Sequence, residues 1–207
     1  MQSVKAVKEG QREYLVPDMY DISALENVLP AKDIYTLEDY FKLPQGAPYQ
    51  LIGGKLIMNP SPIPYHQEIS RKLSRKIGIF IEGSHLGTLY YAPLDVVFGE
   101  KEVYQPDIIF ISNENANIIG EKNIQGPPDA VIEILSPETA YYDLREKLRV
   151  FEKCGVKEYW IVDPGLKKID IYENQEKKFK IFSEAEGEGI VSSKVLEGLS
   201  ISLIEIF

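Results

Sequence analysis

QPDIIF at residues 105–110 and AVIEIL at residues 130–135 are the two stretches that decide the predicted fold. Each is typical of an apolar β-strand, with an acidic residue at its start or inside it. A helical segment follows over about residues 140–154, and EYWIV at residues 158–162 is typical of the next strand. Strands and helices in this order predict a mixed α/β sandwich around one central sheet.

The segments on either side extend this pattern. Thr36 and Asp39 form a capping-box pattern at the start of a short helix, and Gly53-Gly54 separates two apolar strands as in a hairpin. The C-terminal region alternates apolar and polar residues between turns, which predicts extra antiparallel strands. The expected elements are helices at about 36–43, 66–80 and 140–154 (the last capped by Thr139 and ended by Gly155), and strands at about 49–52, 55–58, 88–98, 107–111, 130–135, 158–162, 169–172, 178–182 and 201–207.

The composition suits one folded domain. At 207 residues and 44% hydrophobic content, the chain can bury a sizeable core. We expect a single domain over residues 34–207 and an irregular arm over residues 1–33, where the pattern is mixed and weakly periodic. No apolar run approaches the roughly 20 residues that cross a bilayer, and the first residues lack a signal-peptide core, so a cytoplasmic protein is expected. Cys154 has no cysteine partner and is expected to be a small core residue.

The net charge of -9 argues against nucleic-acid binding, because Lys and Arg supply most of the affinity for phosphates. The distribution of charge matters more than its sum, since a basic face can exist on an acidic protein. Arg71, Lys72 and Arg75 lie beside the apolar stripe of the second expected helix and would form such a face. A solvated helix face is the alternative interpretation of these residues.

Glu133 lies at the centre of VIEIL, residues 131–135, which predicts a buried carboxylate. Burying an ionised carboxylate is costly unless a cation or hydrogen-bond donors accompany it. Asp107 opens a second apolar strand, and if the two strands are neighbours, both acids could hold one divalent metal. An edge strand with Glu133 facing water is the alternative, because period-two alternation also allows it.

Lys147 falls at the margin of the apolar stripe that Leu144, Leu148 and Phe151 form on the helical wheel of the third expected helix. Its ammonium would then lie near the carboxylates, where it can position water, stabilise charge on a phosphate or act as a base. Two alternatives are a snorkelling side chain with its head in solvent and a simple ion pair with Asp143.

Oxygen ligands from Asp107, Glu133 and a backbone carbonyl, that of Ile134, suit Mg²⁺ or Mn²⁺. His66 lies on the inward stripe of its helix and is a further candidate site residue, although a lone histidine there is more often part of the core. Only His85 shares its type, so zinc is not favoured. The chain has no phosphate-binding glycine loop, dinucleotide fingerprint or serine-nucleophile elbow. Two acids and a lysine from adjacent elements therefore make a nuclease the leading hypothesis.

QPDIIF, AVIEILSPET, the following Lys147 and GVKEYWIVDP together resemble the PD-(D/E)XK nuclease superfamily. Within it, the sequence is similar to the Uma-two family of bacterial restriction-endonuclease-like proteins. The resemblance also includes YTLEDY from Tyr35, YQLIGGKLIMNPSP from Tyr49, and His66, so it covers roughly Tyr35 to the C-terminus. It implies an α/β fold with a restriction-endonuclease-like core, in which helices flank a central mixed β-sheet with extra C-terminal antiparallel strands.

The resemblance also implies the roles of the site residues. Asp107 and Glu133 would hold one Mg²⁺ that activates a water to hydrolyse DNA phosphodiester bonds. Lys147 would take the place of the lysine that usually stands two residues after the acid, where this chain has Leu135. His66 and Gln50 would be supporting residues of a metal-dependent endodeoxyribonuclease.

Two departures from the family pattern leave other functions open. The family hairpin usually reads Y-E-L-I-D-G, whereas this chain has Gln50 and Gly53, so a carboxylate that assists metal binding is missing. Gln50 still offers a carbonyl oxygen. The alternatives are a catalytically weakened or inactive nuclease-fold protein that binds nucleic acid or protein, and a structural or oligomerisation protein with surface acids. A homodimer would be consistent with cutting two strands, because that requires two sites.

Overall fold

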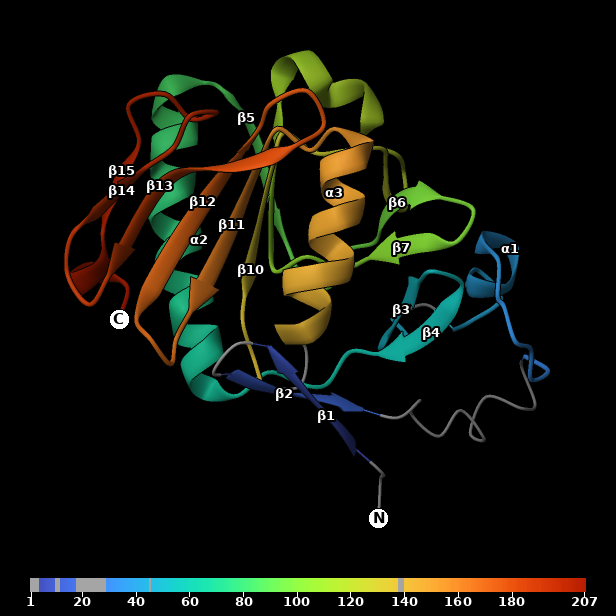
Figure 1. Cartoon of the computed structure of the whole chain (residues 1–207). Coiled ribbons are helices and arrows are strands. Elements are labelled where there is room, and N and C mark those ends of the chain that lie inside the picture. Colours follow the sequence, from blue (N-terminus) through green and yellow to red (C-terminus); the bar gives the residue numbers. More distant parts are fainter. Residues whose placement is uncertain (1–3, 10–11, 18–28, 45, 138–139) are drawn as a thin grey trace.

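A computed structural model describes the backbone of residues 4–9 and 12–17, and the backbone and side chains of residues 29–44, 46–137 and 140–207. Two helices, α2 (Pro64–Ser84) and α3 (Leu148–Cys154), lie on opposite faces of a central β-sheet (Figure 1). In the described part of the chain, no helix has both the length and the apolarity to cross a membrane.

The central sheet has six strands, which span Gly87–Tyr91 (β5), Ile108–Ser112 (β8), Ala130–Ile134 (β10), Glu158–Asp163 (β11), Lys168–Asn174 (β12) and Phe179–Glu186 (β13). Their order is β13-β12-β11-β10-β8-β5. β10 pairs parallel with β11 and antiparallel with β8, so the sheet is mixed, as predicted. β12 and β13 extend it as antiparallel strands, which confirms the prediction for the C-terminal region.

Both faces of β10 are covered, which explains its almost continuous apolar sequence. Successive residues of a strand point to opposite faces of its sheet. Ile132 packs in the core on the α2 side, and Val131 packs in the core on the α3 side. Glu133 comes two residues after Val131 and therefore faces α3.

α2 buries one apolar face against the central sheet. Ile69, Leu73 and Ile77 are fully buried at the helical spacing that the sequence predicted. The stripe ends in the buried Ile81, whereas Phe80, which was expected in that place, is partly buried at its edge.

A second sheet, which was not predicted, has strands at Tyr49–Ile52 (β3), Lys55–Met58 (β4), Val96–Gly99 (β6), Glu102–Tyr104 (β7) and Ile124–Gln125 (β9), in the order β4-β3-β7-β6-β9. β3 and β4 form the predicted hairpin, in which Gly53 and Gly54 both adopt positive φ. The single strand expected over residues 88–98 is wrong, because β5 and β6 belong to different sheets. Pro93 lies between them and lacks the N–H that an inner strand donates.

The helical segment after β10 contains a π-helical turn, Tyr142–Lys147, that continues into α3. The wider turn changes which residues face the sheet. Asp143 and Lys147 are buried, whereas Leu144 and Leu148 are only partly buried. The wheel for a regular α-helix therefore placed Lys147 at the margin of the buried face, although it lies well inside that face.

The predicted helix ends are partly confirmed. Thr36 caps α1 (Leu37–Tyr40) through a capping box, and Gly155 follows α3 in the left-handed region with φ of 93°. Thr139, the predicted cap of the third helix, lies outside the described residues. The expectation that Cys154 is a core residue is wrong, because its position at the end of α3 leaves it exposed.

Two short antiparallel pairs lie near the ends of the chain. The sequence did not predict the pairing of the first two strands in the N-terminal region. The strand expected over residues 201–207 is shorter, because a 3₁₀ turn at Leu203–Glu205 ends it. The two pairs are Val4–Glu9 (β1) with Arg12–Pro17 (β2), and Ile190–Ser192 (β14) with Ser200–Ser202 (β15).

Asp129 stabilises the start of β10. Its buried carboxylate accepts a hydrogen bond from the Ser112 N–H at 2.7 Å and pairs with Lys157 at 2.6 Å. Burial alone would raise the pKa of Asp129, but the bonds from Lys157 and Ser112 outweigh burial and lower it. A group with a lowered folded pKa contributes stability above the ordinary Asp pKa and loses that contribution as the pH falls.

Asp129→Asn is expected to lower the free energy of unfolding at pH 7 by about 1–3 kcal/mol, because Lys157 and the Ser112 N–H lose a charged acceptor. The difference from wild type should shrink as the pH falls, because wild type then loses the same interaction. Urea unfolding at pH 7 and pH 4 measures both effects. Equal stabilities at pH 7 would show that the carboxylate contributes nothing net.

Candidate active site

Glu133 lies in the middle of the central sheet, between β8 and β11, and only 3% of its surface is exposed. The alternative of an edge strand with this carboxylate in water is therefore wrong. Its neighbours on the α3 side of the sheet are apolar, so its compensation has to come from the helix that covers them.

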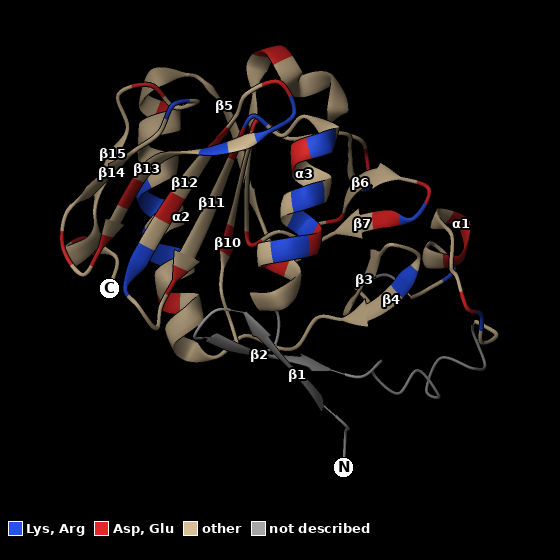
Figure 2. Ribbon diagram, in the orientation of Figure 1, with Lys and Arg blue, Asp and Glu red and all other residues tan. Residues whose placement is uncertain are grey.

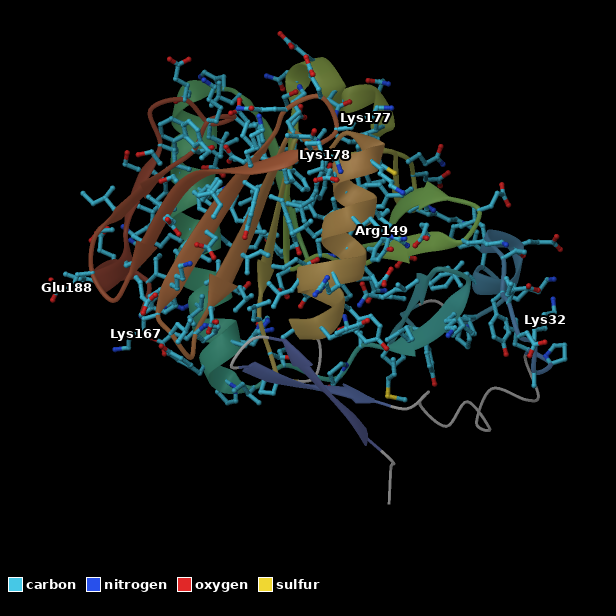
Figure 3. All side chains as sticks on the ribbon, in the orientation of Figure 1. Lys32, Arg149, Lys167, Lys177, Lys178 and Glu188 are labelled. Carbon is cyan, nitrogen blue, oxygen red and sulfur yellow. The ribbon has the colours of Figure 1, made fainter. Side chains whose placement is uncertain are left out.

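Lys147 supplies that compensation. Its Nζ lies 2.7 Å from Oε1 of Glu133 and 2.8 Å from Oδ1 of Asp143. The lysine is 3% exposed, which excludes a snorkelling side chain. Arg149, two residues later, lies on the outer side of α3 (Figure 3), where it pairs with Glu146 at 3.2 Å.

This cluster contains two buried carboxylates and one ammonium. Burial alone would lower the pKa of Lys147, but Asp143 and Glu133 raise it above the ordinary lysine value, so the lysine is charged. Burial raises the pKa of Glu133 well above its ordinary value, and the charges of Asp143 and Asp107 add to this effect against the attraction of Lys147. One negative charge is therefore in excess, and a proton or another cation would compensate it.

Asp107 lies directly before β8 and is held against the end of β10. Its Oδ2 accepts a hydrogen bond from the Ile134 N–H at 2.8 Å. His66 of α2 approaches the same two residues, with its Nε2 3.3 Å from Asp107 Oδ2 and 2.9 Å from the Ile134 carbonyl oxygen. Burial alone would lower the pKa of His66, but Asp107 and the Ile134 carbonyl raise it.

Tyr159 was not identified from the sequence, where it is one aromatic residue of an apolar strand. Its hydroxyl donates a hydrogen bond to the backbone carbonyl of Asp143 at 3.0 Å and so positions the π-helical turn. Burial raises its pKa, and the charges of Glu133, Asp143 and Asp107 raise it further. All three acids therefore lie within electrostatic range of one buried hydroxyl.

These contacts bring together Asp107, Glu133, Ile134, Lys147 and His66, five of the six predicted site residues. The model of the Uma2 family, described as "Putative restriction endonuclease", matches residues 37–204. The chain belongs to the Uma2 family. A comparison with curated proteins returns no match.

A similar fold is also known from a crystal structure. That structure, titled as "a putative nuclease belonging to DUF820 from Anabaena variabilis", is 24% identical in sequence, with a TM-score of 0.70. The match covers 83% of this chain and 97% of that chain. It confirms the predicted restriction-endonuclease-like fold. The family description supports a nuclease-like role.

Gln50 stands where the Uma2 pattern usually has glutamate. Its Oε1 accepts a hydrogen bond from the Gln105 N–H at 2.9 Å, and Gln105 in turn donates to Asp95 at 2.9 Å. Gln50 is thus linked to the backbone two residues before Asp107, and neither acid of the site is among its hydrogen-bond partners in the described structure. Its observed contact positions the segment that carries Asp107.

The oxygen atoms at the Uma2 site are of the kind that binds a divalent metal, although they are few. In the described part of the chain, no group of three or more His, Cys, Asp or Glu side chains is placed to hold a metal. Asp107 Oδ1 and Glu133 Oε2 receive no hydrogen bond from the described residues, because Ile134 and Lys147 donate to the other oxygen of each carboxylate. The Ile134 carbonyl accepts from His66 and has a second lone pair. With the excess negative charge, these hard oxygens suit Mg²⁺ or Mn²⁺.

Proposed function

We propose that this Uma2 chain is a metal-dependent endonuclease that hydrolyses DNA phosphodiester bonds at the site of Asp107, Glu133 and Lys147. The observation that carries the proposal is the buried Lys147 ammonium between the carboxylates of Glu133 and Asp143, at the end of β10, where the Ile134 N–H also holds Asp107. A merely structural ion pair would not need the second acid, whose charge leaves the cluster one cation short.

Asp107, Glu133 and the Ile134 carbonyl would hold the ion. When bound, Mg²⁺ or Mn²⁺ supplies a Lewis acid for the phosphate and lowers the pKa of a bound water. Carboxylate and carbonyl oxygens are the ligands these ions prefer.

Lys147 stabilises negative charge that develops on the phosphate. Its pKa is raised, so it acts as a fixed cation rather than as a base. Asp143 holds the ammonium in place from the preceding turn of the helix. His66 positions Asp107 and the Ile134 carbonyl, and Gln50 positions the backbone that leads to Asp107.

Asp107→Asn is the direct test. Wild type is expected to nick supercoiled DNA with Mg²⁺ or Mn²⁺ and to stop on addition of EDTA. The nicking rate of the variant should be lower by about 100-fold or more. The amide keeps the bond to the Ile134 N–H but loses the charge that holds the cation. Arg149→Met is the control, because this exposed residue lies on the outer side of α3. The control variant should nick DNA as fast as wild type.

Two results would contradict the proposal. Nicking at the same rate in Asp107→Asn would show that the activity lies elsewhere or belongs to a contaminant. No nicking with any divalent metal would favour the inactive nuclease-fold protein that binds nucleic acid or protein.

Linear product that rises with protein concentration would support a homodimer with two active sites.

A further inference from the structure

A groove leads away from Asp107 along α2. It lies between this helix and β5, has a volume of about 640 Å³ and includes Asp107 itself in its wall. It shares the Asp107 carboxylate with the proposed active site, and His66 at the start of α2 approaches the same carboxylate. The groove wall includes polar and basic side chains, among them Ser70, Arg71, Ser74, Arg75 and Thr88.

The cations of α2 are divided between two sides of the helix. Lys72 pairs with Glu68 and donates to the Ile206 carbonyl, and Lys76 pairs with Glu205. By contrast, Arg71 and Arg75 line the groove. Among the described residues, neither arginine has an ion-pair or hydrogen-bond partner. Basic residues on α2 are visible in Figure 2 against an otherwise acidic protein.

The two arginines are suited to successive phosphates of one strand. They are four residues apart, which is about 6 Å along the helix axis, so both face the groove one turn from each other. Glu82 is at the far end of the groove and Asp107 at the near end, so the basic part lies between two acids. A phosphate chain would therefore be held beside the active site rather than inside the acid cluster.

Tyr91 adds an aromatic surface at the active-site end. It is 63% exposed and lies in β5 opposite Ile108, the residue after Asp107. An exposed aromatic ring in the same groove as two unpaired arginines is the combination that single-strand-binding proteins use, with phosphates on cations and a base on the ring. A duplex, in contrast, is read by a convex helix or ribbon that enters its major groove.

We propose that the α2–β5 groove binds a single DNA strand, with Arg71 and Arg75 on its phosphates and Tyr91 stacked on a base. This inference rests on the proposed function, and it narrows the substrate to DNA with an unpaired segment next to the cleaved bond. It also explains how a chain of net charge -9 can bind DNA, because the attraction is confined to one groove.

Equilibrium binding in EDTA tests the groove without cleavage. A fluorescently labelled 12-nucleotide DNA strand is titrated at several salt concentrations with wild type, Arg71→Ala/Arg75→Ala and Lys76→Ala. The slope of log K against log salt should become shallower by about 1.4 in the double variant, or about 0.7 for each lost phosphate contact. Lys76→Ala, which removes a paired cation from the same helix, should keep the wild-type slope.

Tyr91 gives a second, independent readout. Tyr91→Ala should weaken binding roughly 10- to 100-fold with no change in salt slope, because stacking carries no charge. Tyr91→Phe should keep most of the wild-type affinity, because the ring can still stack on a base. The same sequence as duplex DNA should bind more weakly than the single strand, and an RNA strand of the same sequence shows whether the sugar matters. Thermal melting of every variant confirms that it is folded.

The two proposals can fail separately. If wild type nicks DNA but the double arginine variant binds with unchanged affinity and slope, the groove inference is wrong and the nuclease remains. If a duplex binds as tightly as the single strand, the preference for an unpaired strand is wrong. If wild type binds the strand through these residues but never cleaves with any metal, the groove stands and the nuclease proposal is wrong.

Discussion

Glu133→Gln is expected to lower the rate of metal-dependent DNA nicking by about 100-fold or more while leaving the protein at least as stable as wild type. The amide oxygen can still accept the hydrogen bond from Lys147, which measures 2.7 Å in wild type. The variant loses the charge that holds the cation, and it leaves Lys147 and Asp143 as a neutral buried pair. Nicking rates and thermal melting curves of the same preparations measure both effects.

Glu146→Gln is the matched control for this substitution. It makes the same chemical change in the helical segment that carries Lys147, but among the described residues its carboxylate pairs with the exposed Arg149 alone. It should keep wild-type nicking and nearly wild-type stability. A Glu133→Gln variant that melts well below wild type would instead assign Glu133 to a structural ion pair.

The pH dependence of stability provides a further test of Glu133. Its folded pKa is raised well above the ordinary value, so between these two values the folded state binds more protons than the unfolded state. The free energy of unfolding of wild type should therefore fall as the pH rises through this window. The side chain in Glu133→Gln cannot titrate, so the stability of this variant should fall less over the same pH range.

Mn²⁺ should raise the melting temperature of wild type at neutral pH but not that of Glu133→Gln.

The sequence predicted the main site because its acids interrupt apolar strands. Asp107 and Glu133 stand out in QPDIIF and VIEIL, and a carboxylate in such a place needs a partner. Lys147 was also predicted to approach them. Its complete burial depends on the π-helical turn, which regular α-helical spacing does not contain.

Other features depended on long-range packing. Gln50 was predicted as a supporting residue, but its bond to the Gln105 N–H joins β3 to a segment 55 residues away, which no local pattern reveals. The division of residues 88–98 into two strands did have a signal, because Pro93 interrupts the run. The groove lies between a helix and an edge strand, and the sequence showed only its basic side at Arg71 and Arg75.

Lys147→Met is expected to destabilise the protein by about 3–5 kcal/mol, because it leaves two buried carboxylates without their cation. Methionine has a similar length and keeps the apolar part of the packing. For a chain of this size, about 1 kcal/mol shifts the melting temperature by roughly 2–4 °C, so the change is easily measured by thermal melting. Arg149→Met removes a cation from the same helix at the surface and should cost about 0–1 kcal/mol.

Combining Lys147→Met with Glu133→Gln distinguishes a charge effect from a packing effect. The double variant keeps one buried carboxylate, Asp143, instead of two, so it should be more stable than Lys147→Met alone. Simple loss of packing would instead make the two effects additive, so Glu133→Gln would change the stability of Lys147→Met by the same amount as it changes that of wild type. The cluster in wild type is already one cation short, so loss of the Lys147 ammonium should lower the free energy of unfolding strongly. DNA nicking should also disappear in Lys147→Met, because the cation that stabilises charge on the phosphate is gone.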